Sequence, residues 1–122
     1  TTGATVLYIT VPETSKVSNI SFAGTNGHGS SSTDYITFQV LNLGQYGLDT
    51  NQLLHGSCTT KGTDNGGLGG LGTNTTYPLT LTTDTGTLSV SKNDRLKLSA
   101  IVTGTLTTSI ARPSWMVTFA GE

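Results

Sequence analysis

The sequence predicts an all-β fold, in which a single domain is built from two antiparallel sheets packed face to face. Apolar and polar residues alternate in several segments of strand length, as expected when successive side chains point to opposite faces of a sheet. Thr, Ser, Asn and Gly fill most other positions, and this composition favours strands and turns over helices. Two segments are apolar on both faces, which indicates cover on both sides, by a second sheet or by another subunit.

The composition fits one lean domain spanning residues 1–122. Hydrophobic residues make up 34% of the chain, and the 16 glycines bring the apolar share to the level usual for a foldable domain. Charged residues make up only 11%, against about 25% in an average soluble domain. A weakly charged, hydroxyl-rich surface is common where subunits pack side by side, because no charge there must be desolvated.

The clearest pattern, residues 87–102, predicts a β-hairpin. Two alternating stretches flank a turn at residues 92–94, where Asn93 suits a left-handed conformation. The apolar positions share one face and are Leu88, Val90, Leu96, Leu98 and Ala100. We expect the charged residues of this hairpin to lie in solvent and the binding surface to lie elsewhere; they are Lys92, Asp94, Arg95 and Lys97.

Five further segments have the length and alternation of strands, which brings the total to seven or eight. They are residues 4–11, 17–23, 35–43, 78–83 and 114–120, with a shorter strand indicated within 55–60. Trp115, on the last of them, is expected in the core. The one helical signal is a single turn within residues 48–54.

Two segments are predicted to be mobile, an N-terminal arm at residues 1–4 and a Gly-rich loop at residues 61–73. Glycine loses more backbone entropy on ordering than other residues, so such a loop stays mobile unless a neighbour orders it. Leu68 and Leu71 in this loop would be unusual residues to leave in water, and docking on an adjacent subunit would explain them.

The two strands that are apolar on both faces supply the other candidate contacts with a partner subunit. Val6 and Tyr8 lie on the second face of the first strand, and Tyr35 and Leu41 lie on that of residues 35–43. We expect these four side chains to pack on a partner. Tyr46 and Tyr77, both on predicted loops, are the better candidates for stacking on a sugar.

Catalytic and metal-binding patterns are weak. His55 and Cys58 have the spacing of two zinc ligands, but zinc needs three or four, and the remaining candidate is His28 in a loop. A buried thiol and a polar loop histidine are the favoured interpretation. The sequence has no Gly-x-Ser-x-Gly elbow and no evident carboxylate pair. We therefore expect no enzyme, no metal and no cofactor.

Charge and hydropathy argue against two further classes of partner. Six basic and seven acidic residues are scattered along the chain and give a net charge of −1, so a basic stripe for nucleic acid is missing. No apolar run approaches the roughly 20 residues of a membrane-spanning helix. We expect neither nucleic acid nor membrane as a partner.

Seven or eight short strands, a Gly-rich excursion and a single cysteine suit a two-sheet jelly roll. The segment Leu88-Ser-Val-Ser-Lys-Asn-Asp-Arg-Leu-Lys-Leu98 resembles the strand-turn-strand unit of small jelly-roll virion proteins of tailed bacteriophages. Residues 38–50 resemble the strand and Gly-rich loop midway in that group, and Trp115-Met-Val-Thr-Phe119 resembles its last strand. The group includes capsid decoration (cement) proteins and fibre head domains, and its members are typically trimers.

The resemblance implies a homotrimer on the capsid exterior, where it binds the major capsid protein or other virion subunits and stabilises the shell. A first alternative is the receptor-binding head domain of a phage fibre, with Tyr46 and Tyr77 contacting host surface glycans. A second is a bacterial carbohydrate-binding or adhesin module, which would be a monomer.

Overall fold

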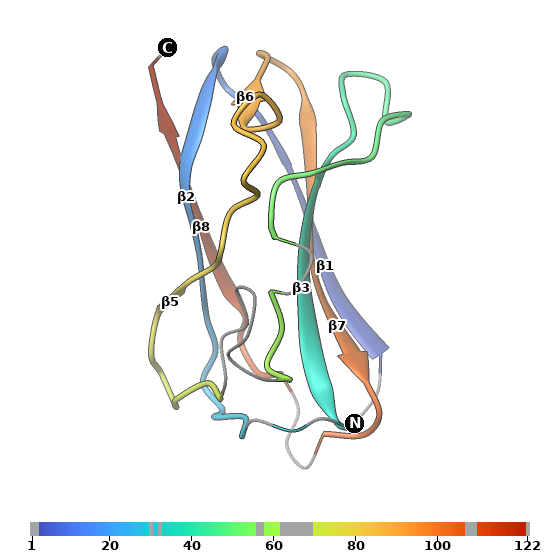
Figure 1. Ribbon diagram of the computed structural model, residues 1–122, viewed down its shortest axis with the longest axis vertical. Helices are drawn as coiled ribbons and strands as arrows, with labels where there is room; N and C mark the ends of the chain where they lie inside the picture. The colour runs from blue at the N-terminus through green and yellow to red at the C-terminus, as the bar shows by residue number, and fades with distance from the viewer. Residues whose placement is uncertain are drawn as a thin grey trace.

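The computed structural model describes residues 3–29, 31, 33–55, 58–61, 70–106 and 110–121, with residues 3 and 4 described by their backbone. Within these ranges the chain forms eight strands and no helix (Figure 1). The strands make two antiparallel four-strand sheets packed as a sandwich. The predicted all-β, two-sheet fold is confirmed.

The first sheet has the strand order β1-β7-β3-β4. Its members are β1 (Gly3–Thr10), β7 (Arg95–Thr103), β3 (Tyr35–Asn42) and β4 (Asn51–Gln52). Strand β7 pairs along its length with β1 on one side and with β3 on the other. The short strand predicted within residues 55–60 contributes one isolated bridge, between Thr59 and Thr37 of β3.

The second sheet is built around β2 (Ser15–Ala23). Strand β8 (Ser114–Ala120) runs along one side of it, and β6 (Ser89–Val90) and β5 (Tyr77–Pro78) pair with its two ends on the other. The predicted strand at residues 78–83 is thus reduced to β5 and a bridge between Leu81 and Leu54. A register shift between Val17 and Asn19 moves the buried positions of β2 from Val17 to Ile20 and Phe22.

The core fills the space between the two sheets. Six inward apolar residues of β3 and β7 have at most 1% exposure, and these are Ile36, Phe38, Val40, Leu96, Leu98 and Ala100. From the second sheet, Phe22 and Trp115 meet Phe38 in a cluster of aromatic rings. Ring centroids lie 4.8 Å apart for Phe22 and Phe38, and 5.0 Å apart for Phe22 and Trp115, in the tilted and edge-on arrangements that aromatic pairs favour. The core position predicted for Trp115 is confirmed.

The hairpin predicted at residues 87–102 is wrong. Strand β6 pairs with β2 in one sheet, whereas β7 pairs with β1 and β3 in the other, so the chain crosses between sheets at residues 91–94. The predicted inward positions are nevertheless all buried: Leu88, Val90, Leu96, Leu98 and Ala100. Alternation reports which face is buried, and the two sheets of a sandwich bury their inner faces against each other, so the same pattern fits either sheet.

The crossing turn explains two of the residues in it. Asn93 has φ 74°, the left-handed conformation predicted for it. Asp94 was expected in solvent but is only 8% exposed, which corrects that prediction. Its Oδ2 accepts hydrogen bonds from the Ser91 backbone N–H (2.9 Å) and from Asn42 Nδ2 (3.0 Å). A turn between two sheets lies against the end of the core, so its amides need a buried acceptor.

Residues 48–54 do not form the predicted helical turn. Asn51 and Gln52 form β4 and pair with Asn42 and Leu41 of β3. One isolated helical turn gains few hydrogen bonds for the residues it orders, whereas the edge of β3 offers ready ladder partners.

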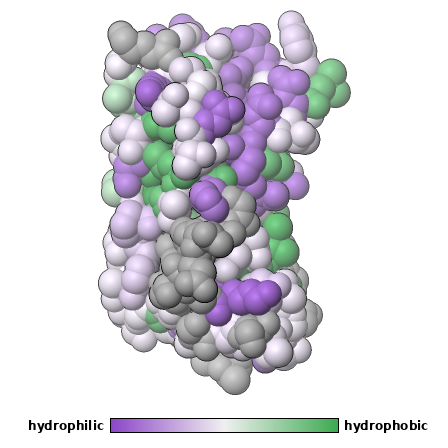
Figure 2. All heavy atoms as spheres, viewed as in Figure 1, coloured by the Kyte–Doolittle hydropathy of each residue, from purple (hydrophilic) through white to green (hydrophobic). Residues whose placement is uncertain are grey.

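The two long strands at sheet ends, β1 and β8, lie on the same side of the sandwich, drawn behind the other strands in Figure 1. Connecting segments, among them residues 43–50 and 79–88, cover the near side (Figure 1). Figure 2 shows this near side, where hydrophilic and intermediate colours cover most of the surface.

Candidate functional site

The outer face of the first sheet exposes large apolar side chains. Leu98 and Val40 point into the core, and Leu7 lies in the same row, so Val6 and Tyr8 on either side of Leu7 point outward. Val6 is 47% exposed, Tyr8 is 61% exposed, and Ile101 on β7 is 37% exposed. We call the surface formed by Val6, Tyr8, Tyr35, Leu41 and Ile101 the apolar sheet face.

The strand register brings four of the predicted contact residues onto this face. Tyr8, Lys97 and Leu41 form one row across β1, β7 and β3. In the adjacent row Val6 and Gln39 flank Ser99, which is only 2% exposed although it points outward, as expected for a short side chain between larger cross-strand neighbours. At the far end of β3, Tyr35 is half-buried, and Lys61 Nζ lies 5.4 Å from its ring centroid.

The charged residues on the strands of this face are both cations, Arg95 and Lys97. Lys97 lies between Tyr8 and Leu41, and a long lysine stem can cover apolar surface while its ammonium stays in water. Strand β7, which comes from the stretch of sequence predicted to lie away from the binding surface, lies at the centre of the apolar sheet face. The face therefore suits a partner that is apolar and carries carboxylates at its rim.

Leu71 is not a surface contact. It is 8% exposed, belongs to the domain's own core, and exchanges backbone hydrogen bonds of 2.9 and 2.7 Å with His28. Its burial needs no partner subunit, which corrects the prediction. Leu68 lies outside the described residues. Of the predicted arm at residues 1–4, Gly3 and Ala4 instead belong to β1 and pair with Val102 and Ile101.

The two candidate sugar-stacking residues lie far apart. Tyr46 is 82% exposed in the turn after β3, near the top of Figure 1, whereas Tyr77 is on β5 at the lower left. Tyr77 is half-buried, and its hydroxyl oxygen accepts a hydrogen bond of 2.9 Å from the Gly72 backbone N–H. The two rings do not line one site.

The histidines and the cysteine do not gather around a metal. Cys58 is fully buried in the core, and burial raises the pKa of its thiol. His28 is 8% exposed, and desolvation lowers its pKa. Burial thus favours the neutral form of both groups. Among the described residues, no group of three or more His, Cys, Asp or Glu side chains could hold a metal ion.

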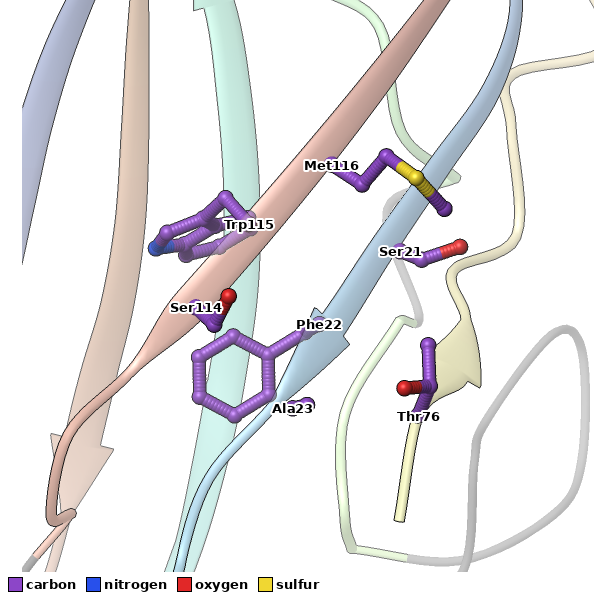
Figure 3. A pocket seen from close by; sticks show the side chains of 7 residues that line it. All are labelled: Ser21, Phe22, Ala23, Thr76, Ser114, Trp115 and Met116. Atoms are coloured by element: carbon purple, nitrogen blue, oxygen red, sulfur yellow. The ribbon is translucent and has the colours of Figure 1, made fainter. Parts of the chain in front are cut away.

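A small hollow of about 160 Å³ lies on the outer side of β2 and β8 (Figure 3). Phe22 and Trp115 point toward the core, whereas Ser21 and Met116 point to the other side of the sheet, toward Thr76 (Figure 3). Ala23 and Ser114 complete the lining, and none of these side chains is an acid or a base. The hollow has no group that could act as a general base.

Among the exposed apolar residues that sequence reasoning missed, two occupy outward positions on their strands, Ile101 and Met116. A signal was present for each, because both are apolar residues out of phase with the buried positions of their strands.

Within the described ranges no helix is long and apolar enough to cross a membrane. No protein-family model matches the chain, and comparisons with curated proteins and with solved structures find no similar protein.

Proposed function

We propose that this protein is a structural subunit of a bacteriophage particle, a decoration or cement protein that binds the outer capsid surface as a trimer and stabilises the shell. The apolar sheet face is the observation that carries the proposal. Four residues predicted to contact a partner lie on the outer face of one sheet, on β1 and β3, with Val6 47% and Tyr8 61% exposed.

Energetics favour covering this face. Full burial of a large apolar side chain contributes roughly 1.5–3 kcal/mol, so completing the burial of each half-exposed residue contributes about 1 kcal/mol. Several such residues on each of three copies add up to a substantial association energy. The low content of charged residues, 11%, limits the number of groups that must be desolvated in exchange.

We infer that the sandwich is a jelly roll. The first sheet contains β1, β3, β4 and β7, and the second sheet contains β2, β5, β6 and β8. The chain therefore passes repeatedly from one sheet to the other. The first strand pairs with the seventh, and the second pairs with the sixth and the eighth, so the first two strands lie beside the last three. Such pairing is expected when a long antiparallel ribbon wraps into two sheets.

The trimer and the phage particle follow from the resemblance of residues 88–98, 38–50 and 115–119 to small phage virion proteins. A head-to-tail contact between copies closes into a ring when the rotation allows, and the apolar sheet face would form one half of that contact. Seated on the shell, the ring would bridge neighbouring capsid subunits and add interface area against the internal pressure of the DNA.

The test is rebinding to capsids of the encoding phage that have been stripped of decoration protein. Wild-type protein should sediment with these capsids as a trimer. Tyr8→Asp should weaken binding by about tenfold or more, because it would bury an unpaired carboxylate on an apolar surface. Tyr46→Asp makes the same change on the exposed turn after β3 and should bind like the wild type.

Two results would contradict the proposal: failure of the wild-type protein to rebind, or equal loss of binding in both folded variants. A glycan-array signal that Tyr46→Ala abolishes would instead support the fibre-head alternative.

A further inference from the structure

Two strands at sheet ends are long and unpaired along one side. In the described part of the chain, β1 (eight residues) pairs with β7 alone and β8 (seven residues) with β2 alone. An unpaired edge presents backbone N–H and C=O groups to any added strand, and proteins usually protect edges with short strands, prolines or charged side chains. The opposite ends of both sheets are strands of two residues, whereas β1 and β8 contain neither proline nor charge.

Exposed apolar side chains concentrate on these edges. Seven large apolar side chains are exposed in the described residues, and four of them are Val6, Leu7, Tyr8 and Met116 on β1 and β8. Leu7 is the most informative, because it lies in the row of Leu98 on the core side of the sheet and is nevertheless 46% exposed. The neighbouring strand that would cover it is the one β1 lacks.

Both open edges border the same side of the sandwich. A hollow of about 170 Å³ lies between them, lined by Thr5, Val6 and Leu7 of β1 and by Pro113 and Trp115 at the start of β8. Thr5 Oγ1 is buried and has no hydrogen-bond partner. A buried hydroxyl without a partner is unusual, because leaving it unpaired is destabilising.

We propose that a second copy of this chain docks on this side through a twofold axis perpendicular to the sheets. β1 then pairs antiparallel with β1 of the second copy, and β8 pairs antiparallel with β8. Each four-strand sheet continues into a sheet of eight strands. A twofold perpendicular to a sheet reverses strand direction and keeps the faces in place, so one axis serves both edges.

Antiparallel geometry restricts the register of this contact. Residues directly opposite one another on antiparallel strands point to the same face of the sheet. The twofold also keeps each residue on its own face, so the register must pair one residue with the same residue of the second copy at its centre. When it is centred on Leu7, that side chain meets Leu7 of the second copy and both become covered. On the outer face, Val6 then lies opposite Tyr8 of the second copy.

Self-association fits the two edges better than addition of an unrelated peptide. An extended peptide would complete one edge, whereas a second copy completes both at once. Because β1 and β8 carry no charge, a copy meets a copy without like-charge repulsion. The contact would be about 27 Å long, the length of eight extended residues, and about 20 Å high, the height of two sheets about 10 Å apart with their side chains. Each copy would therefore bury roughly 550 Å², which is near the lower limit for specific interfaces.

This twofold contact differs from the threefold contact proposed above, since it pairs strand edges and the other covers the outer face of one sheet, although Val6 and Tyr8 of β1 take part in both. The molecular mass in solution distinguishes the two. A hexamer or a dimer supports the twofold contact, and a dimer at the same time counts against the trimer. A trimer or a monomer at every concentration overturns the twofold contact, and a trimer leaves the proposed function intact.

The decisive variant is Met116→Lys/Thr118→Lys, measured by sedimentation equilibrium. Both side chains are exposed on β8, so the folded monomer should tolerate the change. In a register centred on Val117, the introduced ammonium groups lie opposite one another across the twofold. We expect the dissociation constant of this contact to rise about tenfold or more and to recover partly in about 1 M salt, where charges are screened.

Leu48→Lys is the matched control, because Leu48 is 84% exposed on a loop away from the edges and should leave association unchanged. An independent readout is oxidation of Leu7→Cys, which should give a disulfide-linked dimer, whereas Leu48→Cys should not. Equal association of the double variant and the wild type, together with no crosslink in Leu7→Cys, would overturn the proposal.

Discussion

At the scale of single residues, Asp94 shows how one carboxylate holds the crossing between the two sheets. Its Oδ2 joins Asn42 of β3 to the Ser91 backbone in the turn. The same turn exchanges backbone hydrogen bonds with Val11, which follows β1: Val11 donates to the Asp94 carbonyl at 2.8 Å, and Asn93 donates to the Val11 carbonyl at 2.9 Å. Removal of the carboxylate should therefore loosen three segments together.

We predict that Asp94→Ala lowers the free energy of unfolding by about 3 kcal/mol, because the buried Asn42 amide and the partly buried Ser91 N–H lose their acceptor and each such loss costs about 1–3 kcal/mol. Asp84→Ala is the control, since the exposed Asp84 accepts from the Gly86 backbone N–H at 3.1 Å in a similar turn. That variant should change the free energy of unfolding by no more than about 0.5 kcal/mol. Urea unfolding of both variants measures the difference, and equal losses would contradict the role assigned to Asp94.

At the scale of elements, the end of β7 depends on a glycine. Gly104 has φ +77°, and a Cβ there would lie 2.5 Å from the Thr33 carbonyl oxygen and closer still to Asp34 Oδ1. That same Oδ1 accepts a hydrogen bond of 2.9 Å from the Thr105 backbone N–H. The exit from β7 is thus packed tightly against the entry to β3.

Gly104→Ala should lower the free energy of unfolding by at least about 2 kcal/mol, because left-handed strain adds to a clash with backbone that cannot move aside. Gly86→Ala provides the comparison, since Gly86 has no positive φ and the nearest atom to its added Cβ is Asp84 Oδ1 at 3.4 Å. Its free energy of unfolding should stay within about 0.5 kcal/mol of the wild type. Thermal melts of the two variants test this, and a similar midpoint for both would argue against a tight exit from β7.

At the scale of the whole molecule, the sandwich has a closed side and an open side. Loops cover the side shown in Figures 1 and 2, and the other side ends in β1 and β8, whose outer edges have no partner strand in the described part of the chain. Among the described residues, the central strands β2, β3 and β7 are paired on both sides, whereas each edge strand is paired on one. Local opening should therefore begin at β1 and β8 in the isolated chain.

Hydrogen exchange should report this difference. We expect the amides of β1 that point away from β7, and those of β8 that point away from β2, to exchange fast in dilute protein. After assembly their exchange should slow by about tenfold or more, because pairing with the second copy protects them. Amides of β3 provide the internal reference and should not change. Equal exchange of β1 and β8 in dilute and concentrated samples would contradict edge pairing.

Much of the candidate site was predictable from the period of the strands. Val6, Tyr8, Tyr35 and Leu41 were assigned to second faces because they alternate with inward residues, and the register places all four on one outer face. Their exposure was not predictable, because it depends on the place of a strand within its sheet. Leu7 alternates like a core residue and is 46% exposed because β1 is an edge.

By itself the sequence determined where most of the long strands lie, which of their faces points inward, and that Asn93 takes a left-handed conformation. These properties depend on the sterics and hydropathy of residues close together in the chain. The tertiary structure alone decided that β6 and β7 belong to different sheets, that Asp94 and Leu71 are buried, and that both open edges face one side. Those outcomes depend on contacts between distant segments, and an alternating strand satisfies its own pattern equally well in either sheet.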